Sequence, residues 1–238
     1  MTKLSVNINK IATIRNARGG NTPNVLQAAK DIENFGAEGI TVHPRPDERH
    51  ITRKDAFGLK DIVQTEYNIE GYPSEDFIQM VLDIHPTQVT LVPDGPDVIT
   101  SNAGWDCITK KEHLSPIIQQ FKNAGIRVSV FLDPVVEQVD AALACGTDRI
   151  ELYTEAYASG YTDNREAAIA PYIATAKRAT ELGLGINAGH DLSLDNLSYF
   201  VEQIPETLEV SIGHALISDA LYYGLNNAVQ MYKSKLAR

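Results

Sequence analysis

The chain has 238 residues, of which 22% are charged and 43% hydrophobic, a composition typical of a soluble globular protein. Its formal net charge of −10 argues against nucleic acid and anionic membranes as partners. Residues 1–54 nevertheless carry nine basic and five acidic groups. This local positive charge fits either a small anionic ligand or a chance asymmetry. No apolar run is long enough for a membrane span, and the N-terminus lacks a signal-like region. The spacing of Cys107 and Cys145 indicates neither a zinc site nor a disulfide framework. We therefore expect a cytoplasmic protein.

Short β-branched runs recur along the chain, and each is followed by a stretch with helical character. The predicted strands are Leu4–Ile8, Gly39–His43, Asn68–Gly71, Gln88–Val92, Arg127–Leu132, Arg149–Thr154, Gly185–Ala188 and Glu209–Ile212. The predicted helices run from an N-cap at Thr52 to Gln64, from a second N-cap at Ser74 over Glu75–Ile84, and over Val135–Ala144, Glu166–Leu182, Asp195–Gln203 and Ala215–Tyr232. Gly125, Gly146 and Gly183 stand where a helix end meets the next strand, which is typical of helix C-caps.

These units define the expected architecture. Eight strand–helix units of about 30 residues each match the size of a (β/α)8 TIM barrel. No linker or low-complexity stretch divides the chain, so we predict a single α/β barrel domain over residues 1–238. The alternative is an open doubly wound sheet, which would need a GxGxxG fingerprint after its first strand. The sequence there does not contain one, and the barrel is therefore favoured.

Polar side chains stand at the carboxyl ends of most predicted strands, where such barrels place their active sites. In chain order they are Asn7, Asn9, His43, Arg45, Glu70, Glu151, His190 and His214. One histidine at a strand end is usually structural, but a carboxylate within an apolar strand must be paired, protonated or catalytic. Because these ends meet at one mouth, we expect proton transfer by His and Glu side chains. His85 and His113 are expected at the surface or at helix ends.

Two features favour phosphate as part of the ligand. Gly189-His190 and Gly213-His214 end the last two strands, where barrels often bind phosphate, although either pair could be a plain tight turn. Arginines follow the first two strands in predicted loops, and their planar forks suit phosphate oxygens. These loops hold Arg15 and Arg18 after the first strand, and Arg45, Arg49, His50 and Arg53 after the second.

Several chemistries are disfavoured. No predicted strand contains a lysine for a Schiff base, the first strand has no HxH metal pair, and the chain has no GxSxG element. Two alternatives to a two-substrate acid–base enzyme stay open at this point. One is an isomerase or lyase that acts on a single triose or pentose phosphate, and the other is a barrel that only binds a phosphorylated ligand.

The ordered motifs resemble the pyridoxine 5′-phosphate synthase family. The resemblance covers nearly the whole chain and rests on Val6-Asn7-Ile8-Asn9, Arg15-Asn16-Ala17-Arg18-Gly19, Gly39-Ile40-Thr41-Val42-His43, Arg49-His50-Ile51, Asn68-Ile69-Glu70, Leu91-Val92-Pro93, Asn187-Ala188-Gly189-His190 and Ile212-Gly213-His214-Ala215. It implies a (β/α)8 barrel that condenses 3-amino-2-oxopropyl phosphate with 1-deoxy-D-xylulose 5-phosphate and releases phosphate and water. It also implies a homo-octamer without a metal or redox cofactor.

The resemblance assigns roles by position. His43 and Glu70 would be general bases and His190 a general acid. The residues implied in substrate binding are Asn7, Arg18, Arg45, His50, Thr100, Gly213, His214 and, through its backbone, Asp191. Asn9 and Glu151, which stand at strand ends, complete the predicted binding set.

Two positions depart from the family pattern. Asn9-Lys10 replaces Asp-His, and Asp191 replaces the glycine that follows the histidine acid. Asn9 cannot act as a carboxylate base, while Lys10 adds a positive charge that suits a phosphate. We therefore expect rearranged substrate contacts at the first strand with the reaction retained. Tyr222 and Tyr223 on the last predicted helix suit either a subunit interface or core packing.

Overall fold

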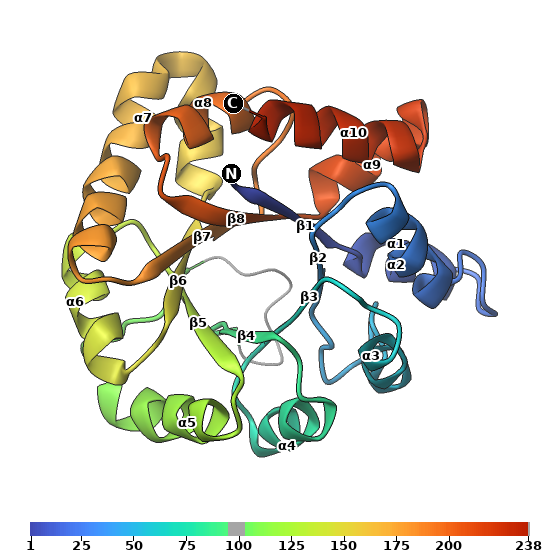
Figure 1. Cartoon of the computed structure of the whole chain (residues 1–238), viewed down its shortest axis with the longest axis horizontal. Coiled ribbons are helices and arrows are strands. Elements are labelled where there is room, and N and C mark those ends of the chain that lie inside the picture. The colour runs from blue at the N-terminus through green and yellow to red at the C-terminus, as the bar shows by residue number, and fades with distance from the viewer. Residues whose placement is uncertain (95–102, 238) are drawn as a thin grey trace.

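Eight parallel strands close into a barrel with the strands in sequence order, as expected (Figure 1). The computed structural model describes residues 1–94 and 103–237. The strands are β1 Lys3–Asn7, β2 Gly39–Val42, β3 Glu66–Gly71, β4 Gln88–Leu91, β5 Arg127–Leu132, β6 Arg149–Tyr153, β7 Gly185–Gly189 and β8 Thr207–Ile212. All eight predicted strands are confirmed, with ends that shift by at most two residues.

Helices surround the barrel on all sides (Figure 1). They are α1 Asn9–Asn16, α2 Val25–Asn34, α3 Arg53–Lys60, α4 Glu75–Ile84, α5 Lys111–Asn123, α6 Val136–Cys145, α7 Glu155–Glu181, α8 Leu197–Gln203, α9 His214–Tyr223 and α10 Leu225–Leu236. None of the helices within residues 1–94 and 103–237 is both long and apolar enough to cross a membrane.

The hydrophobic core is the layer between the strands and the helices. Alternate strand residues such as Val6, Ile40 and Ile69 are fully buried there. The other set faces the barrel interior and is largely polar. Within it, the Thr90 hydroxyl donates to Asn68 Oδ1 at 3.1 Å, and other hydroxyls and amides bond across the strands in the same way. The barrel therefore holds a polar interior inside an apolar shell.

The local signals at helix ends were informative. Thr52 caps α3 in a reciprocal capping box with Asp55, and Ser74 caps α4 through the backbone N–H of Phe77, so both predicted N-caps are confirmed. The predicted glycine C-caps all have positive φ. His85 is the C-cap of α4 with φ of 58°, and its Nε2 lies 2.5 Å from the Ala124 carbonyl oxygen. Its predicted position at a helix end is therefore confirmed.

Two expectations about helices were wrong. The stretch after β1 is not an open loop but helix α1. The last predicted helix is divided into α9 and α10 by Gly224, whose φ of 80° and ψ of 149° no helical residue adopts. The helix predicted over Glu166–Leu182 is confirmed as the part of α7 that follows the non-helical residue Asn164, and the first part of α7, from Glu155, was not predicted.

Candidate active site

Glu70 and His190 form the centre of the site at the carboxyl ends of the strands. Glu70 lies in β3 with its side chain 1% exposed, and its Oε2 lies 4.0 Å from Nε2 of His190, which follows β7. The Asn7 amide donates to the same Oε2 at 3.4 Å. Glu70 Oε1 makes no hydrogen bond within the described part of the chain, so one carboxylate oxygen is left for a ligand.

His190 is held as a cation. Burial lowers its pKa, but the Glu70 carboxylate, with Glu151 and Asp191, outweighs burial and raises the pKa of His190 to about 9. Its backbone N–H donates to the Ser211 carbonyl at 3.2 Å. The φ of His190 is 85°, a left-handed value that is rare for a side-chain-bearing residue and is often found at functional sites.

His43, after β2, has the opposite electrostatic surroundings. Burial, then the positive charges of Arg45, His50 and His190, lower the pKa of His43 well below its ordinary value. Its imidazole is therefore neutral at neutral pH. The backbone N–H of His43 donates to Asn9 Oδ1 at 2.9 Å, so Asn9 positions the backbone of the predicted base.

Glu151 in β6 lies beside the central pair. Its side chain is 1% exposed and its Oε2 lies 3.3 Å from the Thr90 hydroxyl oxygen, whereas Oε1 has no partner among described residues. Burial, with the negative charge of Glu70, raises the pKa of Glu151 to about 8. At neutral pH Glu151 is thus mainly a neutral acid next to a carboxylate and an imidazolium.

His50 and Lys10 lie on the β1–β2 side of the mouth. The rings of His43 and His50 are 6.3 Å apart, and His50 Nδ1 accepts the Ile51 N–H at 2.9 Å. Burial, then the charges of Arg45, Lys10 and Arg49, lower the pKa of His50 to about 4. The Lys10 ammonium, in the first turn of α1, has no hydrogen bond or ion pair with any residue that the structure describes.

The arginines predicted for phosphate binding differ in whether they line the mouth or bond within the fold. Arg45 is buried and its Nη2 lies 3.0 Å from Asp94 Oδ2, at the edge of a hollow of about 450 Å³ that His43 also lines. Arg15 lies in α1, and its guanidinium bonds to both oxygens of Asp55, at 2.6 and 2.8 Å, and to the His50 carbonyl. Because its donors are used within the fold, Arg15 is a structural residue. Arg18 is exposed just beyond α1.

The turns after β7 and β8 are close to the mouth but are well supplied with internal contacts. The Asp191 N–H donates to the Thr154 hydroxyl at 3.1 Å, and its side chain is exposed. A Cβ on Gly213 would lie 2.9 Å from Asn7 Cβ, so glycine there permits close approach to β1. His214 is exposed at the start of α9, and Thr100 lies outside the described residues.

Two residues at the mouth were missed by the sequence analysis. Tyr153 lies near His190, with ring centroids 6.3 Å apart, and Asp94 pairs with Arg45. Tyr153 stands two residues after Glu151 in the same strand, so strand alternation alone could have placed it on the same face. Nothing local marks Asp94, since its partner lies 49 residues away.

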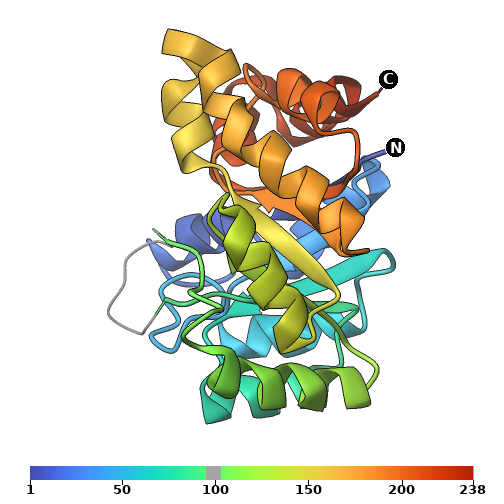
Figure 2. The ribbon, with the colours of Figure 1, turned by 90° about the vertical axis from the view of Figure 1, so that its left-hand side faces the viewer.

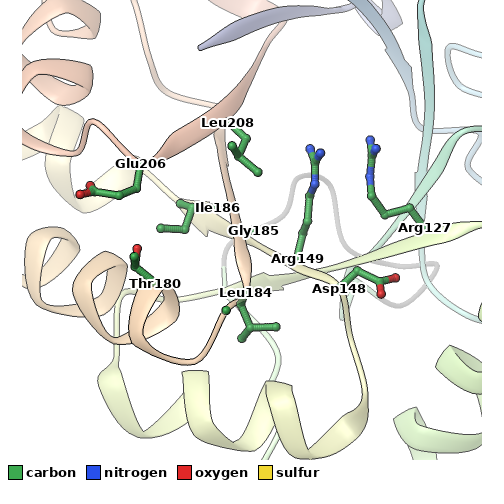
Figure 3. Close-up of a pocket in the computed structure, with 10 residues that line it drawn as sticks. Arg127, Asp148, Arg149, Thr180, Leu184, Gly185, Ile186, Glu206 and Leu208 are labelled. Carbon is green, nitrogen blue, oxygen red and sulfur yellow. The ribbon is translucent and has the colours of Figure 1, made fainter. Parts of the chain in front are cut away.

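A second hollow, of about 470 Å³, lies at the opposite end of the barrel, where β5, β6 and β7 begin (Figure 3). Arg127 and Arg149 project side by side there. Arg127 pairs with Glu66 at 2.5 Å, and Arg149 donates to Asn187 at 3.1 Å. None of the predicted catalytic residues lines this hollow, so the two ends of the barrel are chemically distinct.

Comparison with known proteins gives one consistent result. The sequence signature of the family described as pyridoxal phosphate biosynthesis protein PdxJ matches residues 4–238. Relatives include the pyridoxine 5′-phosphate synthases of Flavobacterium johnsoniae, 62% identical over 236 residues, and Cytophaga hutchinsonii, 63% identical over 238 residues. These alignments cover 99% and 100% of this chain and 100% of each relative.

Two solved structures with a similar fold have little sequence in common with the chain. Phosphoribosyl anthranilate isomerase from Thermococcus kodakaraensis has a TM-score of 0.62 at 11% identity, with 100% of both chains covered. The protein named KGPDC from Streptococcus mutans has a TM-score of 0.66 at 11% identity, with 99% of this chain and 97% of that chain covered. At this identity the likeness concerns the barrel fold alone.

Proposed function

The chain belongs to the PdxJ family and is an enzyme of vitamin B6 biosynthesis, and from this membership we propose that it condenses 3-amino-2-oxopropyl phosphate with 1-deoxy-D-xylulose 5-phosphate. The products are pyridoxine 5′-phosphate, inorganic phosphate and water. Closing the ring requires an amine to add to a ketone, protons to leave carbon and nitrogen, and departing oxygens to be protonated. The protein must therefore offer both bases and an acid at one place.

One observation carries this proposal, namely that His43, Glu70 and His190 stand at the carboxyl ends of β2, β3 and β7, and that the two histidines have opposite electrostatic surroundings. His43, kept neutral by burial and by Arg45, acts as a general base. His190, kept protonated by Glu70, acts as the general acid. Glu70 acts as the second base through the carboxylate oxygen that has no partner among the described side chains and backbone groups. Each positioned group supplies about 10²–10⁴-fold in rate.

The substrate phosphates are proposed to bind at the rim around these groups. Arg45, His50 and Lys10 supply positive charge or N–H donors on the β1–β2 side. Gly213 and His214, at the N-terminus of α9, supply the other site, where a helix start favours an anion. The remaining members of the proposed binding set are Asn7, Asn9, Arg18, Thr100, Glu151 and Asp191.

The decisive experiment is a turnover assay on the purified protein with both substrates, following pyridoxine 5′-phosphate and phosphate release. Wild type should form product, and Glu70→Gln should be slower by about 10²–10⁴-fold because it lacks the base. Product formation that survives Glu70→Gln unchanged would remove Glu70 from the mechanism. A folded wild type that turns over a single phosphosugar without the amine would favour the isomerase or lyase alternative.

Lys10 provides a prediction specific to this chain. Its ammonium has no protein partner among the described residues and lies near enough to His50 to lower the pKa of that ring. Lys10→Ala should raise the KM of one substrate by about 10- to 100-fold, the loss expected for a charge-assisted hydrogen bond, with little change in kcat. The exposed Lys54→Ala serves as the control. If Lys10→Ala leaves both KM values unchanged, Lys10 does not bind phosphate.

A further inference from the structure

We propose that Glu70, Glu151 and His190 bind one divalent transition-metal ion of the Zn²⁺ type, and that the ion inhibits turnover by occupying the groups that transfer protons. The binding follows from the geometry of the three side chains. The inhibition rests in addition on the function proposed above. No ion is required for the reaction in this scheme, because the same atoms must be free to act as base and acid.

The three side chains converge on one point of the barrel interior. Each offers a ligand atom, and these atoms all lie within 4.8 Å of one another. Ligand atoms around a tetrahedral zinc ion lie about 3.4 Å apart, given metal–ligand distances of about 2.0–2.2 Å. Small side-chain rotations would therefore bring the three groups into coordination distance. Among the residues that the structure describes, this is the one cluster of three or more such side chains.

The polar atoms of the cluster are also short of partners. Glu70 Oε1, Glu151 Oε1 and His190 Nδ1 are all buried and make no hydrogen bond to any described group. Buried polar atoms are normally paired, so three orphaned atoms in one cluster indicate a place built to receive a ligand. A cation would satisfy the oxygens of both carboxylates at once.

The donor set selects the class of cation. An imidazole nitrogen with two carboxylate oxygens is a set that binds Zn²⁺ and its chemical relative Co²⁺, whereas Mg²⁺ and Ca²⁺ prefer oxygen ligands alone. Binding of the ion releases the protons of His190 and Glu151 to solvent, because a metal ligand must be deprotonated. Two carboxylates then balance the charge of the divalent ion in a buried site. The His43 side of the mouth is unsuitable by comparison, because Arg45 and Arg49 add positive charge there.

The surroundings suit a bound ion in two further respects. The Thr90 hydroxyl oxygen lies 3.3 Å from Glu151 Oε2 and the Asn7 amide donates to Glu70, and such contacts orient metal ligands. The His190 side chain is 25% exposed, so the cluster is open to the mouth and an ion can enter. A water molecule or a substrate oxygen would supply the fourth ligand.

The test is a Co²⁺ titration of the full-length, substrate-free protein, followed by the visible absorption of the bound ion. We expect saturable binding of one Co²⁺ per chain and displacement of Co²⁺ by Zn²⁺. Glu151→Gln and His190→Asn should each weaken binding by at least about tenfold, since each removes a ligand. His85→Asn, at an exposed histidine at the end of α4, should bind as wild type does. Thermal unfolding checks that each variant is folded. If Glu151→Gln does not fold, His190→Asn still tests the site, because the His190 side chain is partly exposed and its replacement should be tolerated.

The outcomes separate the claims. Absence of one-to-one binding, or equal binding by wild type and both ligand variants, would overturn the site. Site-specific binding with undiminished turnover in the presence of Zn²⁺ would overturn the inhibitory role. Because the titration uses no substrate, failure of the turnover assay would count against the proposed function and not against the metal site.

Discussion

At the scale of single residues, His43 and His190 show that position within one mouth does not determine charge. Burial lowers the pKa of both rings, but Arg45 lowers the pKa of His43 further, whereas the Glu70 carboxylate raises the pKa of His190 above its ordinary value. The charge on His190 in turn helps to keep His43 neutral. The acid and the base are therefore coupled, and loss of either should change the pH profile of the other.

His50 supplies a stability prediction at this scale. Its folded-state pKa of about 4 lies below the value of about 6.5 for an unfolded histidine, so between these values the unfolded chain binds a proton that the folded chain does not. Stability should therefore fall as pH falls from 6.5 toward 4. In urea unfolding at several pH values in this range, His50→Gln should lose less stability than wild type. Parallel pH dependences would contradict the assignment.

The site was predictable from sequence where a strand end or a buried carboxylate marked it. Glu70 and His190 were identified in this way, and the structure brings them together. Arg15 was misplaced because its partner, Asp55, lies 40 residues further on, and ion pairs between distant residues leave no local pattern. The raised pKa of Glu151 likewise depends on its burial and then on Glu70, 81 positions away in sequence but adjacent in the barrel, and both follow only from the folded chain.

At the scale of elements, the strands were predicted better than the helices. Most strands are short runs rich in β-branched residues, and their ends were predicted to within two residues. The last helix was predicted as continuous because Gly224 is a single residue in an otherwise helical pattern, and glycine within a helix is often tolerated. Only the backbone conformation shows that α9 and α10 are separate.

The same glycine supplies an element-scale prediction. Gly224 has φ of 80° and ψ of 149°, a region open essentially to glycine alone, whereas Gly146 has a left-handed conformation that asparagine tolerates. Gly224→Asn should destabilise the protein by about 1–3 kcal/mol, and Gly146→Asn by much less. Neither added Cβ would meet an atom within 3.4 Å, so denaturant unfolding of the pair isolates the backbone effect. Equal losses in the free energy of unfolding for the two variants would contradict this backbone effect.

At the scale of the whole molecule, the site and the chain ends lie on opposite sides of the barrel. Figure 2 shows both termini on the same side, and β1 starts there, so the carboxyl ends of the strands face away from them. Additions at either terminus are therefore remote from Glu70 and His190. Substrate access and any contacts made through the termini are separated by the length of the strands.

Self-association is a further proposal at this scale. We propose a homo-oligomer, because Leu221, Tyr222 and Tyr223 at the end of α9 are 74%, 87% and 52% exposed, and adjacent exposed apolar side chains usually mark an interface. Sedimentation velocity should show a species heavier than the 26.1 kDa chain. Tyr222→Glu with Tyr223→Glu should shift it to a smaller species, while Ile108→Glu, at another exposed apolar residue, should not. A wild-type monomer would refute the proposal.

The left-handed backbone of His190 affects how variants of this protein can be selected for thermal resistance. Glycine is the residue that adopts φ of 85° without steric cost, so a library screened for thermal resistance alone should enrich glycine at position 190. Such variants would resist heat but lack the imidazole. Laboratory evolution of this barrel therefore needs a catalytic screen in every round, because robustness and turnover select different residues at this position.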